Sequence, residues 1–174
     1  MNYHNIQSTD MLNGTGLRVT AFFSGCSHHC NNCQNQQTWD SNSGIIFDDD
    51  AKQEIFAELD KDYINGITLS GGDPLNEYNV RSMYLFVKEL KEKYQNKTIW
   101  LYTGYTLENI LESLKLTQED DYRLEIVKMC DVIVDGCFVE ELADINYPYA
   151  GSTNQRVIDI KKTLEKNEVV LYCD

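Results

Sequence analysis

Three cysteines lie within eight residues of this chain, and their spacing limits what the chain can be. Cys26, Cys30 and Cys33 follow the pattern C-x3-C-x2-C. A structural zinc site or an electron-transfer iron–sulfur cluster usually takes four protein ligands. A four-iron cluster held by three thiolates leaves one iron open to another ligand, and an open metal position is where chemistry takes place. The triplet therefore predicts a reactive metal centre in the loop that carries it.

The alternative is a zinc knuckle completed by His28, His29 or a distant cysteine. Zinc sites usually combine two C-x2-C pairs, and this chain has one such pair. The other cysteines, Cys130, Cys137 and Cys173, are scattered along the sequence. We therefore interpret the triplet as a three-thiolate iron–sulfur site and the other cysteines as buried or free thiols. His28 and His29 are expected to supply hydrogen bonds or charge that tune the cluster.

Length and charge narrow the class of protein. A chain of 174 residues predicts one domain, residues 1–174. The formal net charge of −13 argues against nonspecific binding of nucleic acid, because the phosphates would be repelled. No apolar run is long enough to span a bilayer, and the start of the chain lacks the apolar core of a secretory leader. We expect a cytoplasmic protein with no membrane or nucleic-acid partner, whose cysteines are not in disulfides.

The hydrophobic pattern predicts alternating strands and helices. Apolar stretches that end in small or turn-forming residues indicate strands at 17–23, 66–69, 98–102 and 132–134. Helical periodicity lies between them, at 51–59, 80–94 and 107–114, and Thr117 with Asp120 resembles a capping box before 124–127. Two more short strands are expected at 157–160 and 169–172. This order predicts an α/β fold with a mainly parallel sheet.

The ends of the four expected strands carry the chemically suggestive residues. These ends are the cysteine loop, the glycine pair at 71–72, Thr103-Gly104 and Asp135-Gly136. In parallel α/β folds ligands collect at the carboxyl ends of the strands, so the four motifs are expected to share one site. Adjacent glycines let the backbone approach a ligand, although a glycine pair before Pro74 is also typical of a tight turn.

These motifs together resemble those of a known family. The cysteine triplet after the first strand and the glycine pair after the second resemble the radical S-adenosylmethionine enzymes. Five further segments, 13–18, 34–39, 102–105, 134–136 and 151–159, are similar to the activating proteins of anaerobic ribonucleoside-triphosphate reductases. Thr15 stands where that family often has proline, Asn32 where it often has glycine, and Asp73 where glutamate is commoner. None of these departures removes a cysteine ligand.

The resemblance implies a fold, two cofactors and a reaction. The fold is a partial β/α barrel, consistent with a chain shorter than the roughly 250 residues of a complete one. Cys26, Cys30 and Cys33 hold a [4Fe-4S] cluster whose open iron binds S-adenosylmethionine. One electron from the cluster cleaves the sulfonium, and the resulting 5′-deoxyadenosyl radical takes a hydrogen atom from a glycine of the large reductase subunit. An electron donor such as flavodoxin is a further expected partner.

The resemblance also implies roles for residues beyond the cysteines. Gly71, Gly72 and Asp73 are expected to receive the methionine ammonium group, and Thr103 to line the same pocket. The shorter side chain of Asp73, compared with glutamate, leaves its exact contact open.

Three later residues are expected to reach the same ligand. Asp135 either contacts the ligand or a cation, or it is only a turn residue at a strand end. Asn154, Gln155 and Arg156 either contact the adenosine or the methionine carboxylate, or they pack the last strand. Arg156 suits a carboxylate, because a guanidinium can pair with two oxygens.

Three other functions remain open at the level of sequence. The chain could activate a different glycyl-radical enzyme, such as one of the formate-lyase type, although those activators tend to be longer. It could also be a radical enzyme acting on a small molecule, or a noncatalytic zinc-binding module.

Overall fold

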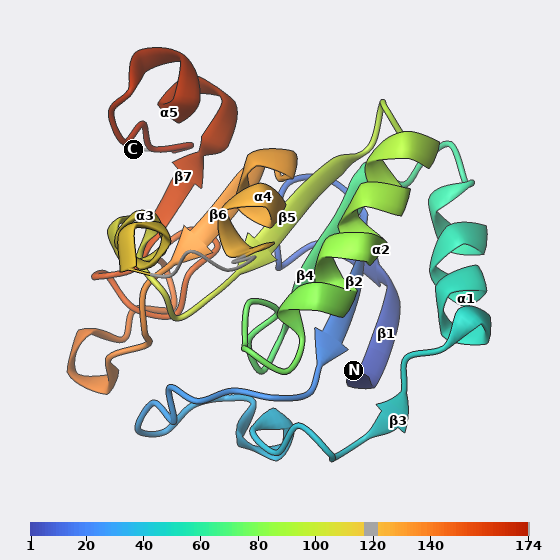
Figure 1. Ribbon diagram of the computed structural model, residues 1–174, viewed down its shortest axis with the longest axis horizontal. Helices are drawn as coiled ribbons and strands as arrows, with labels where there is room; N and C mark the ends of the chain where they lie inside the picture. Colours follow the sequence, from blue (N-terminus) through green and yellow to red (C-terminus); the bar gives the residue numbers. More distant parts are fainter. Residues whose placement is uncertain (117–121, 174) are drawn as a thin grey trace.

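The computed structural model describes residues 1–116 and 122–173, and the capping box expected at Thr117 and Asp120 lies outside them. The described chain forms a seven-stranded sheet in the order β3-β1-β2-β4-β5-β6-β7 (Figure 1). The strands are β1 (Asn2–Asp10), β2 (Arg18–Phe23), β3 (Ile45–Ile46), β4 (Gly66–Gly71), β5 (Thr98–Tyr102), β6 (Val132–Asp135) and β7 (Arg156–Asp159).

The centre of the sheet is parallel and its edges are antiparallel. Strands β2, β4, β5 and β6 are parallel neighbours, whereas β1 and β3 at one edge and β7 at the other run antiparallel to the strands they pair with. The predicted α/β class with a mainly parallel sheet is confirmed. The carboxyl ends of the four central strands consequently lie at the same edge of the sheet.

The helices follow the strands in the predicted order. They are α1 (Asp49–Leu59), α2 (Val80–Lys93), α3 (Leu107–Leu116), α4 (Tyr122–Met129) and α5 (Ile160–Lys166), with 3-10 turns η1 (Gln36–Thr38) and η2 (Glu140–Leu142). Helix α1 begins where Asp48 accepts the backbone N–H of Ala51, as an N-cap residue does. Helix α2 buries one stripe, formed by Met83, Phe86, Val87 and Leu90.

The two faces of the sheet have different chemistry. Alternate residues of the central strands, among them Val19, Phe23 and Leu69, join the main apolar core with α1, α2 and α4. These three helices lie over the same face (Figure 1). The opposite face carries a smaller apolar cluster around Trp100 and Val134, next to buried polar side chains. None of the helices in the described ranges is long and apolar enough to cross a membrane.

Arg18 braces the amino ends of three parallel strands. Its side chain is fully buried, and it lies 5.4 Å from the ring centroid of Trp100. It donates five hydrogen bonds, to the hydroxyls of Thr68 and Thr98 and to the backbone carbonyls of Thr15, Ile67 and Thr98. Burial lowers the pKa of the guanidinium to about 10. These five bonds tie the starts of β2, β4 and β5 together.

Three local predictions were wrong or incomplete. Residues 169–172 do not form a strand, and only Leu171 makes an isolated bridge, to Ile158. Ile160 begins helix α5 instead of ending a strand, because Asp159 accepts the N–H of Lys162 and caps the helix. The edge strands β1 and β3 were missed, since the polar sequence of β1 lacks apolar alternation.

Candidate functional site

Hydrogen bonds join the four strand-end motifs into one site. The N–H of Asp73 donates to the carbonyl of Gly25 at 2.7 Å, which fastens the loop after β4 to the loop after β2. The N–H of Thr103 donates to Val134 at 3.0 Å, and the thiol of Cys137 lies 3.4 Å from the carbonyl of Gly104. The loop after β2 runs along the lower edge of the view in Figure 1, past the carboxyl end of β2. The prediction that these motifs meet is confirmed.

The backbone of the cysteine loop is folded back on itself. The N–H of Cys26 donates to the carbonyl of Trp39 at 3.0 Å, and that of Cys33 to the carbonyl of Cys30 at 3.2 Å. His29 and Asn32 have φ of 48° and 52°, in the left-handed region that bulky residues seldom adopt. These turns bring the three cysteines, all partly exposed, onto one short loop.

Backbone amides are directed at the cysteine sulfurs. The N–H of Asn35 lies 3.4 Å from Sγ of Cys33. Burial raises the pKa of Cys26 to about 11, and the backbone N–H groups of His28 and His29 act in the opposite direction. A thiol must lose its proton to ligate a metal, so metal binding here releases protons, and the amides then stabilise the thiolates.

The loop also contains an unsatisfied polar atom. Nε1 of Trp39 is buried and has no hydrogen-bond partner among the residues that the structure describes. The Trp39 ring stacks on His29, with ring centroids 4.6 Å apart. A buried donor without a partner costs about 1–3 kcal/mol, and sulfur atoms of an iron–sulfur cluster accept such bonds. Three thiols, amides aimed at sulfur and a free indole N–H fit a [4Fe-4S] cluster.

The geometry differs from that of a preformed single-ion site. Across residues 1–116 and 122–173, no three His, Cys, Asp or Glu side chains lie close enough together to hold one metal ion. A cubane cluster does not require this, since each of its cysteines binds a different iron atom.

The glycine pair allows two backbones to touch. Gly71 has φ of 107°, which favours glycine, and Gly72 lies directly against the cysteine loop. A Cβ added to Gly72 would lie 2.5 Å from the carbonyl oxygen of Gly25 and 2.9 Å from that of Thr38. Only glycine therefore fits at this approach between the two loops. That the pair also binds a ligand stays a prediction.

Asp73 is the centre of the hydrogen-bond network. The residue is fully buried, and its Oδ1 accepts the N–H of Leu75 at 2.8 Å. Its Oδ2 accepts the hydroxyl of Thr103 and the N–H of Gly104, both at 3.0 Å, and lies 2.8 Å from Nε2 of His28. Thr103, predicted to line the pocket, therefore orients Asp73. His28 was expected only to tune the cluster, and its link to Asp73 had no signal in the sequence.

A second charged group lies at the end of β6. The buried Asp135 accepts the N–H of Leu107 at 2.8 Å and two bonds from Arg156, at 2.9 and 2.5 Å. Arg156 also donates a hydrogen bond to each carboxylate oxygen of Glu108, at 2.9 and 2.7 Å. These bonds lower the pKa of Glu108 to about 2. The guanidinium that we predicted for a methionine carboxylate is thus paired with two protein carboxylates. Its contact with a ligand stays a prediction.

The segment before Arg156 is fastened to the same strand end. Nδ2 of Asn154 donates to the carbonyl of Cys137, and Nε2 of Gln155 to that of Gly136, both at 2.9 Å. Asn154 and Gln155 therefore bind the loop after β6 in the structure, and contact of 154–156 with a ligand stays a prediction.

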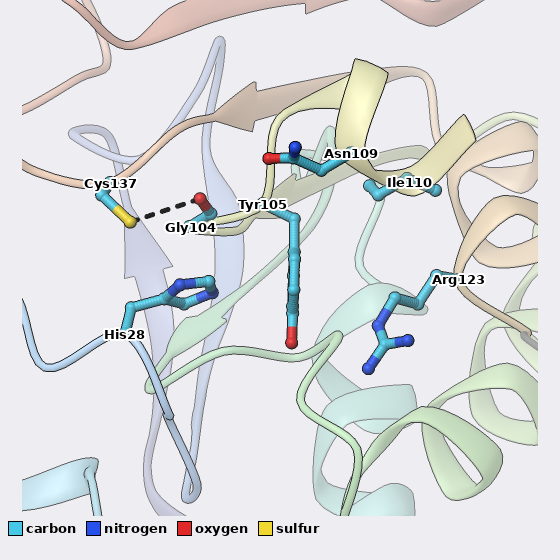
Figure 2. A pocket seen from close by; sticks show the side chains of 7 residues that line it. All are labelled: His28, Gly104, Tyr105, Asn109, Ile110, Arg123 and Cys137. Atoms are coloured by element: carbon cyan, nitrogen blue, oxygen red, sulfur yellow. Dashed lines mark hydrogen bonds between the residues drawn. The ribbon is translucent and has the colours of Figure 1, made fainter. Parts of the chain in front are cut away.

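A cavity of about 350 Å³ opens beside the cysteine loop (Figure 2). Its lining comes from the loops after β2, β5 and β6 and from the starts of α3 and α4, and consists of His28, Gly104, Tyr105, Asn109, Ile110, Arg123 and Cys137. The volume falls at the lower end of the range typical of small-molecule sites. Arg123 was missed, because its approach to Tyr105, 4.9 Å from the ring centroid, joins segments that the sequence does not relate.

Cys137 is a fourth thiol near the triplet. Burial first, and then the neighbouring thiol of Cys30, raise the pKa of Cys137 to about 12. The side chain is half-buried and is not in a disulfide.

The three-thiol loop, anchored at the carboxyl end of a parallel sheet, indicates an iron–sulfur protein of the α/β class. A family model described as a 4Fe-4S single cluster domain matches residues 12–158. This match favours the iron–sulfur interpretation of the triplet over the zinc knuckle.

Several curated relatives share one name, anaerobic ribonucleoside-triphosphate reductase-activating protein. The relative from Haemophilus influenzae is 40% identical over 157 residues, which cover 89% of this chain and 96% of the relative. Those from Vibrio cholerae and Escherichia coli are 39% and 38% identical, over 89% and 90% of this chain and 96% and 97% of their own lengths. The chain belongs to this family, and the resemblance predicted from its sequence is confirmed.

Proposed function

We propose that this chain is a radical S-adenosylmethionine activase that generates a glycyl radical on the large subunit of an anaerobic ribonucleoside-triphosphate reductase. The observation that carries the proposal is the anchoring of the three-cysteine loop to Asp73 and the glycine pair, in a chain whose relatives are named as activators of that reductase. The name of those relatives supports the reductase as the target. The position of the cysteine loop and the glycine pair at one edge of the sheet supports the proposed radical chemistry.

Each side chain has a role in this proposal. Cys26, Cys30 and Cys33 hold the [4Fe-4S] cluster. Gly71 and Gly72 let backbone carbonyl groups approach the methionine ammonium group, and Asp73 supplies a fixed carboxylate beside them. When bound, the cluster and S-adenosylmethionine together supply one-electron chemistry that yields a carbon radical able to take a hydrogen atom from glycine.

The remaining predicted residues shape the rest of the pocket. Thr103 orients Asp73 by donating its hydroxyl hydrogen. Asp135 and Arg156 hold the start of α3 against the end of β6, next to the cavity wall formed by Asn109. Asn154 fastens the loop that carries Cys137. We place the nucleoside part of the ligand in this cavity.

The fold assigned in this proposal is a partial β/α barrel in one domain, residues 1–174. The helices on one face of the sheet support it, because such helices form the outside of a barrel and leave the other face as its interior. An incomplete barrel leaves a lateral opening for a peptide loop of the reductase. A reactive radical requires that this loop be in contact before cleavage.

The cellular setting is part of the same proposal. The electron comes from a donor such as flavodoxin, and the protein works in the cytoplasm, where thiols stay reduced. A net charge of −13 opposes binding to nucleic acid or to an anionic membrane surface.

The test is an anaerobic reaction with the reductase large subunit, S-adenosylmethionine and a reductant. The expected products are methionine, 5′-deoxyadenosine and a glycyl doublet in the electron paramagnetic resonance spectrum. Serine at Cys26, Cys30 or Cys33 is expected to abolish all three, whereas serine at Cys173 is expected to leave them intact. A formate lyase used in place of the reductase distinguishes the target. Failure of the wild type to cleave the nucleoside overturns the proposal.

A further inference from the structure

The side chain of His28 leaves the cysteine loop and reaches the end of β4. Its Nε2 lies 2.8 Å from Oδ2 of Asp73, whose side chain is fully buried, while that of His28 is 15% exposed. Because a carboxylate only accepts hydrogen bonds, Nε2 carries the proton and donates it. This bond joins the loop that holds the thiols to the residue that follows the glycine pair.

The His28 ring packs closely against two neighbouring residues, Gly104 and Tyr105. Gly104 lies so close to the ring that a Cβ there would overlap it. The side chain of Tyr105 lies beside that of His28 (Figure 2). The two rings pack edge to face, with centroids 4.6 Å apart and an angle of 75° between the planes. The ring is therefore confined to one orientation. A histidine that touched the carboxylate only incidentally would not require a glycine and an aromatic ring around it.

His28 is the one donor to Asp73 that comes from the cysteine loop. The other donors to this carboxylate in the described chain are Leu75, in the loop after β4, and Thr103 and Gly104, at the end of β5. Without the imidazole N–H, the carboxylate keeps its bonds to the sheet side and loses its bond to the metal-binding side.

We propose that His28 is a positioning residue for S-adenosylmethionine, which fixes the Asp73 carboxylate toward the methionine ammonium group and holds it in register with the cysteine loop. This inference rests on the proposed function. His28 acts through Asp73, so its loss is expected to weaken binding of the nucleoside while the cluster stays in place.

The test uses the reconstituted holoprotein and three variants. His28→Phe keeps a ring that packs against Gly104 and Tyr105 and removes the N–H. His28→Gln instead provides an N–H donor that reaches about as far toward Asp73. His4→Phe is the matched control, because the 2.8 Å bond of His4 goes to Ser43 and not to Asp73 or to a cysteine. Iron content, and the dissociation constant of S-adenosylmethionine from its effect on the spectrum of the reduced cluster, are measured for each.

We expect His28→Phe to bind the nucleoside roughly tenfold to a hundredfold more weakly, the range for loss of one hydrogen bond to a charged group. Its iron content is expected to equal that of the wild type, and His28→Gln to regain most of the affinity. Wild-type affinity in His28→Phe overturns the inference. Loss of iron in that variant also overturns it, since His28 would then serve the cluster. A wild type that binds no nucleoside instead refutes the proposed function itself.

A double variant shows whether His28 works through Asp73. Asp73→Asn is expected to weaken binding by itself, and adding His28→Phe to it is expected to cause little further loss, because the shared contact is already broken. Independent, additive losses from the two changes contradict the inference. Adding His4→Phe to Asp73→Asn is the control for the cycle.

Discussion

Replacing Gly72 with alanine is expected to push the glycine loop away from the cysteine loop. A Cβ at this position would lie 2.5 Å from the carbonyl oxygen of Gly25, and ordinary contact begins at 3.4 Å, so the backbones must separate by about 0.9 Å (3.4 minus 2.5). The atom in the way belongs to the backbone and cannot rotate aside. The same carbonyl accepts the N–H of Asp73, so the carboxylate moves as well.

The magnitude follows from that displacement. Overpacking of this kind costs about 1–3 kcal/mol. For a chain of this length that cost corresponds to a fall of about 2–12 °C in the midpoint of thermal unfolding. A misplacement of about 1 Å in a positioned site reduces the rate by about a hundredfold. We therefore expect Gly72→Ala to cleave S-adenosylmethionine about a hundredfold more slowly, with a moderate loss of stability.

The assay compares Gly72→Ala with Gly151→Ala. Neither glycine has a φ in the left-handed region. The comparison therefore tests the steric effect of the added Cβ without a contribution from backbone strain. The Cβ at Gly151 would lie 3.0 Å from the ring of Phe138 and 3.5 Å from Oε1 of Gln155, and both contacts are with side chains, not with backbone atoms. Anaerobic 5′-deoxyadenosine formation and thermal unfolding are measured for both variants. A Gly72→Ala protein with wild-type rate and midpoint refutes the reasoning.

Three further changes test other parts of the account. Trp39→Phe removes the buried indole N–H. Because hydrogen bonds to the cluster sulfurs raise its reduction potential, a redox titration of this variant is expected to give a lower potential. An unchanged potential contradicts the fit of Trp39 to the cluster. The pKa of Glu108 is lowered from 4.5 to about 2 by Arg156, so the pair stabilises the fold above pH 4.5 and this contribution disappears as the pH falls toward 2. Because the Glu108 side chain is 54% exposed, Glu108→Gln is expected to remove only about 0.2–1 kcal/mol of that pH-dependent stability, and identical acid-unfolding curves for the two proteins show that the pair is inert. Arg18→Lys keeps at most three of five hydrogen bonds and is expected to lower the free energy of unfolding in urea by roughly 3–6 kcal/mol, while a loss below about 1 kcal/mol shows that the brace is unimportant.

Local signals in the sequence predicted the parallel centre of the sheet and the strand-end motifs. Apolar strands that end in glycine or threonine are a short-range pattern, and the edge they share follows from parallel pairing. The polar strand β1 gave no such pattern, because its place between β3 and β2 is set by pairing with those strands. Residues 169–172 carry a strand-like sequence, yet they pair with β7 only through an isolated bridge between Leu171 and Ile158.

Partner choice among side chains could not be predicted from spacing. Arg156 was expected at a ligand carboxylate, but Asp135 and Glu108 are its partners in the structure, and their approach depends on how β7 returns beside β6. The bond from His28 to Asp73 joins residues 45 positions apart. The cysteine triplet was recognisable because its ligands are adjacent in sequence.

The most direct measurement is electron–nuclear double resonance on the reduced holoprotein, with S-adenosylmethionine labelled by nitrogen-15 at the amino group and oxygen-17 at the carboxylate. Couplings of both labels to the cluster are the predicted result, because an iron without a cysteine can chelate both groups. Couplings absent from a sample with full iron content and saturating nucleoside contradict the central claim.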